Sequence, residues 1–421
     1  ILKHTYSALT LALGFCLFLL PIPFGANRPM SWMAPMFAFY VLALVCLVAF
    51  WRGHLSITPA LRLAWPVILS LLLLMAWMGV QFILPEPYGT WEPHATLLQM
   101  QKTLMYLCIF CLVLLLIRGQ PELELLCWVI VVGGCLQVVI KIVTDSPGTY
   151  INRNHFAGYL EMGLALALGL MISRLDGSSA VGWRESVRRW LNTFLSAKVL
   201  IRILIITLVV GLILSRSRMG NTAFFGALLV SGFFALYAFR GSGKSITLFF
   251  VSILIVDIVL MGAFFGLDKL QDRFEELNVA EDSRLYQSEI TTEMLKVHGL
   301  TGIGAGAYYT AVPTYRDERI GAFFIYAHND LLQLPLELGV PGSLFLLICL
   351  GYSFVLALRA QLVRRNVFMK SMGFASTMGL MSLLIHSSAD FNLQLVSNAG
   401  TFMLLLAIPF LAMSLNRRRS R

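Results

Sequence analysis

The chain has 421 residues, of which 58% are hydrophobic and only 13% are charged. Soluble globular domains hold roughly 25% charged residues, so this composition excludes an ordinary soluble protein and predicts an all-α integral membrane protein. The net charge of +10 would suit nucleic-acid binding in a soluble protein. In a membrane protein, lysines and arginines gather in the cytoplasmic loops, and we therefore expect no nucleic-acid partner.

Apolar runs long enough to cross a bilayer follow one another along the chain. About 20 apolar residues cross the hydrocarbon layer as a helix, and no alternating strand pattern interrupts these runs. The sequence predicts about twelve transmembrane helices, at residues 7–22, 31–50, 63–84, 97–117, 122–142, 155–173, 199–215, 218–239, 245–266, 341–358, 368–387 and 395–415. No short apolar segment with a cleavage site opens the sequence, so we expect the first run to be a retained span.

The basic residues predict how these spans are oriented. An even number of spans puts both termini on one side, and the basic tail at 416–421 indicates that this side is cytoplasmic. Residues 1–266 then hold helices one to nine, 267–340 form one large periplasmic loop folded as a helical cap, and 341–421 hold helices ten to twelve with the cytoplasmic tail. Tryptophans and arginines alternate in the cytoplasmic segment 174–198, which predicts an amphipathic helix against membrane lipids.

Several arginines fall on the outside, where the charge rule does not explain them. They are Arg28, Arg153, Arg216, Arg218, Arg284, Arg316 and Arg319. Arg216 and Arg218 belong to the motif SRSRMG, in a tight turn before a helix that begins near Met219. Guanidinium groups bind phosphate through paired hydrogen bonds, and the amides of a helix N-terminus also favour an anion. The turn is therefore a candidate anion site, which Arg153 would join; the alternative is that the arginines reach lipid headgroups.

A second basic position opens a helix expected to run to about Val297. Asp282 suits its N-cap and Gly299 its end. Arg284 in the first turn opposes the helix dipole, so we expect it to have an anionic partner, either a ligand or a neighbouring acid. Three residues are expected to face inward, with Ile290 and Met294 nearby: Leu285, Thr292 and Leu295.

The segment 299–306, GLTGIGAG, is rich in glycine. It follows no strand and precedes no Lys-Ser/Thr pair, so it is not a nucleotide-binding loop. We interpret it as a compact turn that lets the cap backbone approach the membrane helices.

The motif YAHND at 326–330 precedes a short helix that should break near 339–342. Asn329 or Asp330 would cap that helix, and the dipole would favour a neutral His328, which can accept a proton. A purely structural histidine is the alternative.

The motif HSSADFN at the outer end of the eleventh span offers His386 and Asp390 as secondary candidates. They could orient the cap or contact a sugar, and a structural role is as well supported.

No metal site or cofactor is expected. The seven cysteines all lie in apolar runs, and clustered carboxylates of the kind that hold a catalytic metal are scarce. The sequence predicts a reaction that needs neither metal nor ATP.

In this order, these motifs resemble the bacterial O-antigen ligase and O-antigen polymerase superfamily over most of the chain. The residues that carry the resemblance are SRSR at 215–218, TGIGAG at 301–306, HND followed by LGVPG within 328–342, NRNHFAGYL at 152–160 and HSSADFNLQ at 386–394. The resemblance implies a glycosyltransferase at the periplasmic face of the bacterial inner membrane, with an undecaprenyl-diphosphate-linked glycan as donor.

The resemblance also implies roles for individual residues. Arg218, with Arg216 beside it, and Arg284 would hold the diphosphate, and His328 would lie near the point of transfer. Single displacement with inversion at the anomeric carbon is expected. We favour the ligase, whose acceptor is the lipid A–core oligosaccharide, because the chain ends soon after the twelfth span. Polymerase, protein O-oligosaccharyltransferase and, from a different class, anionic-lipid transporter are the alternatives.

Overall fold

The structure is a computed structural model. It describes residues 2–85, 88–175, 197–240, 248, 251–252, 255, 284–315 and 324–415. Every regular element within those ranges is a helix, as the composition predicts. The expected span at 245–266 and the segment 176–196 of the expected amphipathic helix fall largely or wholly outside the described residues.

The helices follow the apolar runs closely. The elements are α1 Leu2–Leu19, α2 Pro29–Trp51, α3 Pro59–Leu63, α4 Trp65–Ile83, α5 Pro93–Leu116, α6 Gln120–Thr144, α7 Arg153–Ile172, α9 Ala197–Leu214, α10 Arg218–Ala238, α13 Tyr308–Ala311, α14 Asp330–Val363, α15 Val367–Ser387 and α16 Val396–Ser414. Short 3₁₀ turns lie at Phe24–Ala26, Val312–Thr314 and Asn392–Gln394. Residues 284–298 form a further helix. Within the described ranges, nine helices are long and apolar enough to cross a membrane.

The expected span at 63–84 is confirmed as one helix, α4, within two residues of its expected ends. The chain forms α3 and then α4, which meet at Ala64. Pro66 lies in the first turn of α4, where its missing N–H costs no intrahelical bond, so a new helix starts there readily.

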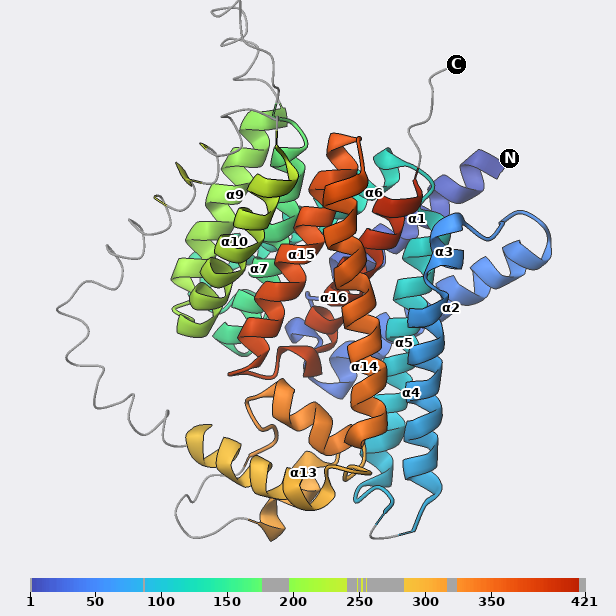
Figure 1. Cartoon of the computed structure of the whole chain (residues 1–421), viewed down its shortest axis with the longest axis vertical. Coiled ribbons are helices and arrows are strands. Elements are labelled where there is room, and N and C mark those ends of the chain that lie inside the picture. Colours follow the sequence, from blue (N-terminus) through green and yellow to red (C-terminus); the bar gives the residue numbers. More distant parts are fainter. Residues whose placement is uncertain are drawn as a thin grey trace, which may run out of the picture.

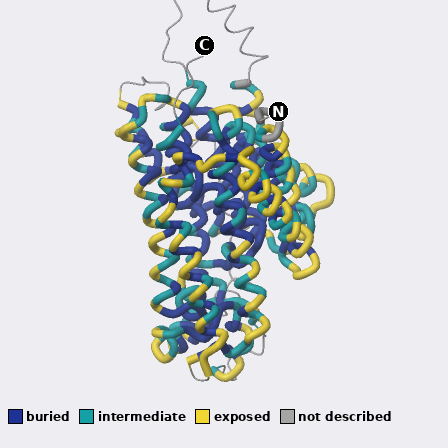
Figure 2. Tube along the Cα trace, turned by 90° about the vertical axis from the view of Figure 1, so that its right-hand side faces the viewer, coloured by how far each residue is buried: buried dark blue, intermediate teal, exposed yellow. Residues whose placement is uncertain are grey.

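The bundle has two distinct ends. In Figure 1, α1 begins and α16 ends at the upper end, and helix 284–298 and α13 lie across the lower end. Helix α7 is at the centre, with every residue from Asn154 to Ile172 buried. Figure 2 shows this buried interior and a second buried core within the lower end.

Helix 284–298 packs against the core of the lower end with Ile290, Met294 and Leu295, as expected, but not with Leu285. Tyr286, Ile290 and Met294 are buried in the core of the lower end. Leu285 was expected to face inward but is 69% exposed, because the buried stripe follows the i, i+4, i+8 spacing set by Tyr286. The helix ends at residue 298, next to Gly299, as predicted.

The glycine turn joins this helix to the membrane bundle. The Ile303 N–H donates to the Leu336 carbonyl (3.0 Å), and the Trp91 N–H donates to the Ile303 carbonyl (2.9 Å). Gly304 has φ +99°, and a Cβ there would lie 2.0 Å from Thr90 Oγ1. Only glycine permits both this backbone angle and this approach, which confirms the turn as the place where backbones meet.

Helix α14 is broken near its start, as predicted for 339–342. Gly339 has φ +66°, so residues 330–338 form a separate short helix before the long apolar part. The buried Glu337 carboxylate accepts hydrogen bonds from Gly306 N–H (2.9 Å) and Gln333 Nε2 (2.8 Å). Glu337 therefore fixes this short helix, and the segment before it, against the glycine turn.

Candidate active site

The turn between α9 and α10 is held by its serines. The Ser215 hydroxyl donates to the Leu212 carbonyl, and the Ser217 N–H donates to Ser215 Oγ at 3.1 Å. Ser217 is the N-cap of α10, and its Oγ accepts the Gly220 N–H at 3.1 Å. These bonds replace helix bonds that a chain reversal loses, so the backbone of the turn is well defined.

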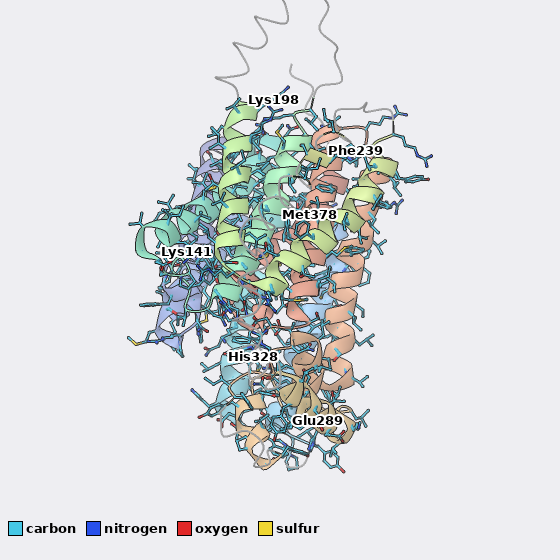
Figure 3. All side chains as sticks on the ribbon, turned by 90° about the vertical axis from the view of Figure 1, so that its left-hand side faces the viewer. Lys141, Lys198, Phe239, Glu289, His328 and Met378 are labelled. Carbon is cyan, nitrogen blue, oxygen red and sulfur yellow. The ribbon has the colours of Figure 1, made fainter. Side chains whose placement is uncertain are left out.

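The arginines of the turn point outward. Arg216 and Arg218 are both exposed, and Arg216 adopts the left-handed backbone, with φ +53°. The hydrogen bond and charge of Lys141, and then the charge of Arg216, hold the pKa of the Asp145 carboxyl below its usual value. Arg216 is therefore close to the exposed acid after α6, whereas Arg218 is the first residue of α10. This turn joins the lower ends of α9 and α10, because Lys198 near the start of α9 and Phe239 after α10 both lie at the upper end (Figure 3); it lies above helix 284–298 in Figure 1.

His328 lies where the bundle meets the lower end. It precedes Asn329, whose Oδ1 accepts the Leu331 N–H at 3.0 Å and caps α14 as predicted. Its own φ is +52°, and its side chain is 28% exposed. Figure 3 shows His328 between Met378 in the bundle and Glu289 in the lower end.

The neighbour of His328 is the Asp390 carboxylate, which is fully buried. His328 Nδ1 lies 3.6 Å from Asp390 Oδ1, and His155 Nε2 lies 3.5 Å from the same oxygen. Asp390 also accepts hydrogen bonds from Asn154 Nδ2 and from the Phe391 N–H. Burial alone would raise the pKa of Asp390, but the two imidazoles beside it hold that pKa well below its ordinary value.

Phe391 organises the rings around this carboxylate. Tyr326 stacks on it with ring centroids 4.3 Å apart, and His155 and His328 meet it edge-on at 4.4 and 4.7 Å. The motif HSSADFN thus supplies both the acid and the aromatic ring that face His328. Sequence reasoning named His155 and Phe391 within motifs but gave them no role.

His386 lies inside the bundle. Its side chain is fully buried, and Nδ1 lies 2.7 Å from Glu161 Oε1 of α7. The Ser382 hydroxyl donates to the other oxygen, Oε2, at 2.6 Å. Sequence reasoning missed Glu161, although an acid within an apolar span is itself a signal of function.

The remaining predicted basic residues lie on separate elements. Arg284 is the first described residue of helix 284–298, is partly buried, and acts electrostatically on His386. Arg153 is exposed at the first position of α7. Arg316 and Arg319 lie outside the described residues.

An apolar cavity of about 290 Å³ adjoins this region on the side of α4, α5, α14 and α16. Asp330 and Leu393 line it, together with leucines and methionines of the surrounding helices. The Leu393 N–H donates to Asp330 Oδ2 at 2.8 Å, so this part of the cavity wall joins the segment that follows His328 to the one that follows Asp390.

Within the described ranges, no group of three or more histidine, cysteine, aspartate or glutamate side chains could hold a metal ion. Metal independence stays a prediction.

Comparison with known proteins identifies one family. Residues 203–347 match the family model described as O-Antigen ligase. The matched segment runs from α9 through the arginine turn, helix 284–298, the glycine turn and His328 into α14. A search of curated proteins found no match to the chain.

Proposed function

We propose, because the chain belongs to the O-antigen ligase and polymerase superfamily, that it is an O-antigen ligase. The family supports glycosyl transfer of the ligase or polymerase type. In our proposal the donor is a glycan on undecaprenyl diphosphate, the acceptor is the lipid A–core oligosaccharide, and the product belongs to lipopolysaccharide biosynthesis.

The proposed topology has twelve spans in the bacterial inner membrane. Residues 1–266 would hold nine spans, 267–340 the periplasmic cap, and 341–421 three spans and a cytoplasmic tail. Two observations support it: the nine membrane-length helices of the described part, and the position of helix 284–298 at the end opposite the start of α1 and the end of α16 (Figure 1).

The donor diphosphate would be bound by arginines of the turn between α9 and α10 and of helix 284–298. Arg218, Arg216 and Arg284 are the proposed ligands, and Arg153 would assist them. The exposed guanidinium groups of the turn support this role, because arginine stays charged and pairs with phosphate oxygens through two hydrogen bonds at once. These groups would stabilise the charge that develops on the leaving diphosphate.

The proposed acceptor base is His328. In the tautomer that directs Nδ1–H toward Asp390, Nε2 keeps the lone pair that a base needs. The separation of 3.6 Å is long for a hydrogen bond, but such contacts tighten when substrate binds. The observation that carries the proposal is this partly exposed histidine, 3.6 Å from a fully buried carboxylate.

The reaction would be one displacement. The acceptor hydroxyl oxygen bonds to the anomeric carbon as the bond from that carbon to the diphosphate oxygen breaks. The hydroxyl proton passes to His328, and undecaprenyl diphosphate leaves with the bonding electron pair. Because the donor bond supplies the driving force, the proposal needs no ATP, and because the arginines would take up the charge on the leaving diphosphate, it needs no metal. The apolar cavity beside Asp330 supports a lipid-borne substrate, since a hydrocarbon chain matches its lining.

The test is transfer by the purified protein. Lipid-linked glycan is mixed with lipid A–core, with a second molecule of the lipid-linked glycan, or with an acceptor peptide, always with chelator and without nucleotide. Glycan on lipid A–core supports the ligase. Growth of the glycan on its own lipid would replace it with the polymerase, and glycan on peptide with the protein transferase. Movement of intact donor across a vesicle membrane, without a new glycosidic bond, would indicate a transporter.

A further inference from the structure

One buried polar pair has no part in the transfer chemistry. Glu161 of α7 and His386 of α15 lie 2.7 Å apart, with both side chains fully buried. Ser382 completes the group through its bond to Glu161 Oε2. An ionisable pair among membrane helices costs free energy to bury, so its presence calls for a role at a specific place.

The first neighbour of this pair is the arginine turn. A Cβ at Gly220, in the first turn of α10, would lie 3.0 Å from Glu161 Oε1 and 2.8 Å from Ala157 Cβ. The Gly220 N–H is itself bound to Ser217 Oγ, between the two arginines. The Glu161 carboxylate is therefore packed directly against the helix turn that presents Arg218.

The second neighbour is the carboxylate beside His328. His386 precedes Asp390 by four residues, and the Ala389 N–H donates to the His386 carbonyl at 3.1 Å. The charge of Asp390 acts on His386, as does that of Arg284. One end of the buried pair thus meets the arginine turn, and the other continues into the loop that holds Asp390.

We propose that Glu161 and His386 are positioning residues that fix the arginine turn of α10 relative to Asp390 and His328. This inference rests on the proposed function. The pair joins α7 and α15, and the absence of a side chain at Gly220 lets α10 close on the same point. Diphosphate and acceptor hydroxyl must be held at a defined separation for an in-line displacement, and a shift of about 1 Å can cost about 100-fold in rate.

A merely structural pair would behave differently. Its loss would lower stability and the amount of folded protein, but the folded fraction would keep the donor KM and kcat. Loss of a positioning pair raises the donor KM or lowers kcat relative to a control variant that has the same stability.

The experiment compares Glu161→Gln, Gly220→Ala and Ser376→Ala with the wild type. Glu161→Gln keeps the shape of the side chain but replaces a carboxyl oxygen with an amide group, and Gly220→Ala pushes α10 away from α7. Ser376→Ala is the control: it removes a buried hydrogen bond from α15 to the Leu405 carbonyl (2.8 Å) on the side of α16. For each protein, kcat, the KM for lipid-linked glycan, binding of undecaprenyl diphosphate and Tm are measured.

We expect kcat/KM to fall about 100-fold in both Glu161→Gln and Gly220→Ala, with weaker undecaprenyl diphosphate binding and wild-type values in Ser376→Ala. Wild-type kcat/KM and binding in Glu161→Gln overturn the inference and leave the proposed function standing. If the wild type transfers no glycan, the proposed function fails. The binding comparison then decides alone whether Glu161 positions the anion site. If Gly220→Ala does not fold, Glu161→Gln carries the test.

Discussion

The substitution Asp390→Asn removes the charge beside His328 and also the hydrogen bond from Asn154, because an amide nitrogen then faces Asn154 Nδ2. The amide oxygen can still accept the Phe391 N–H, which Asp390 Oδ1 now accepts at 2.8 Å. The change that bears on transfer is the loss of the negative charge 3.6 Å from His328 Nδ1. We expect transfer to slow, because that charge stabilises the imidazolium that forms when the acceptor proton arrives.

The distance sets the magnitude. At this separation and an effective dielectric constant of ~20, two unit charges attract by roughly 4 kcal/mol, which is about 10³-fold in rate. Desolvation offsets part of this attraction, and positioned general bases contribute ~10²–10⁴-fold. We therefore expect kcat to fall between ~10² and ~10³-fold, with little change in the KM for the lipid-linked donor.

The assay measures initial transfer rates at saturating donor for the wild type, Asp390→Asn, His328→Ala and the double variant. Because the two groups act as one unit, we expect the double variant to be little slower than His328→Ala. Glu293→Gln, an exposed acid paired to Lys296 on helix 284–298, is the matched control and should be neutral. If the rate loss of the double variant equals the product of the two single losses, or if Asp390→Asn transfers at the wild-type rate, the reasoning is refuted.

The remaining predictions concern the donor site, the glycine turn, the acid range and the chemistry. Arg284→Ala should lower the transfer rate by ~10²–10³-fold without loss of folded protein. Lys296→Ala, on the same helix, should leave the transfer rate unchanged. A wild-type rate in Arg284→Ala would show that Arg284 does not belong to the donor site. Gly304→Ala should lower Tm more than Gly53→Ala. Both glycines have positive φ, but only a Cβ at Gly304 would collide with a neighbour, Thr90. Equal decreases in Tm would contradict this packing. The pKa of Asp390 in the folded protein lies below its ordinary value of about 4. The ionised carboxylate therefore stabilises the fold at pH values above about 4. The difference in free energy of unfolding between the wild type and Asp390→Asn should therefore be constant above about pH 5 and shrink toward lower pH. A difference that grows on acidification would be inconsistent with a lowered pKa. Chelator and removal of nucleotide should leave the rate unchanged, and a requirement for a metal ion or a nucleotide would contradict the proposed metal- and ATP-independent reaction.

Periodicity and length predicted most of the helices because burial in lipid dictates both. Runs of 18 to 25 apolar residues became α2, α5, α6 and α16 within a few residues of the expected ends. The break at Gly339 and the glycine turn were also predictable, since only glycine tolerates those backbone angles.

The partners of buried polar groups were not predictable in the same way. Glu161 and His386 are 225 residues apart, and Asn154 reaches Asp390 across 236. Nothing in local sequence says which polar group in one span faces which in another, because helix rotation and packing decide it. The same reason explains why Leu285 is exposed. Apolar residues lie on more than one face of helix 284–298, and contact with the core of the lower end selects the face that holds Tyr286.

The most direct test of the central claim, a single displacement that expels the diphosphate, is the configuration of the new glycosidic bond. NMR of the product made by the purified protein, from a donor of known anomeric configuration, reports it. We predict inversion at the anomeric carbon. Retention would contradict the mechanism, because it requires two displacements at the anomeric carbon rather than one.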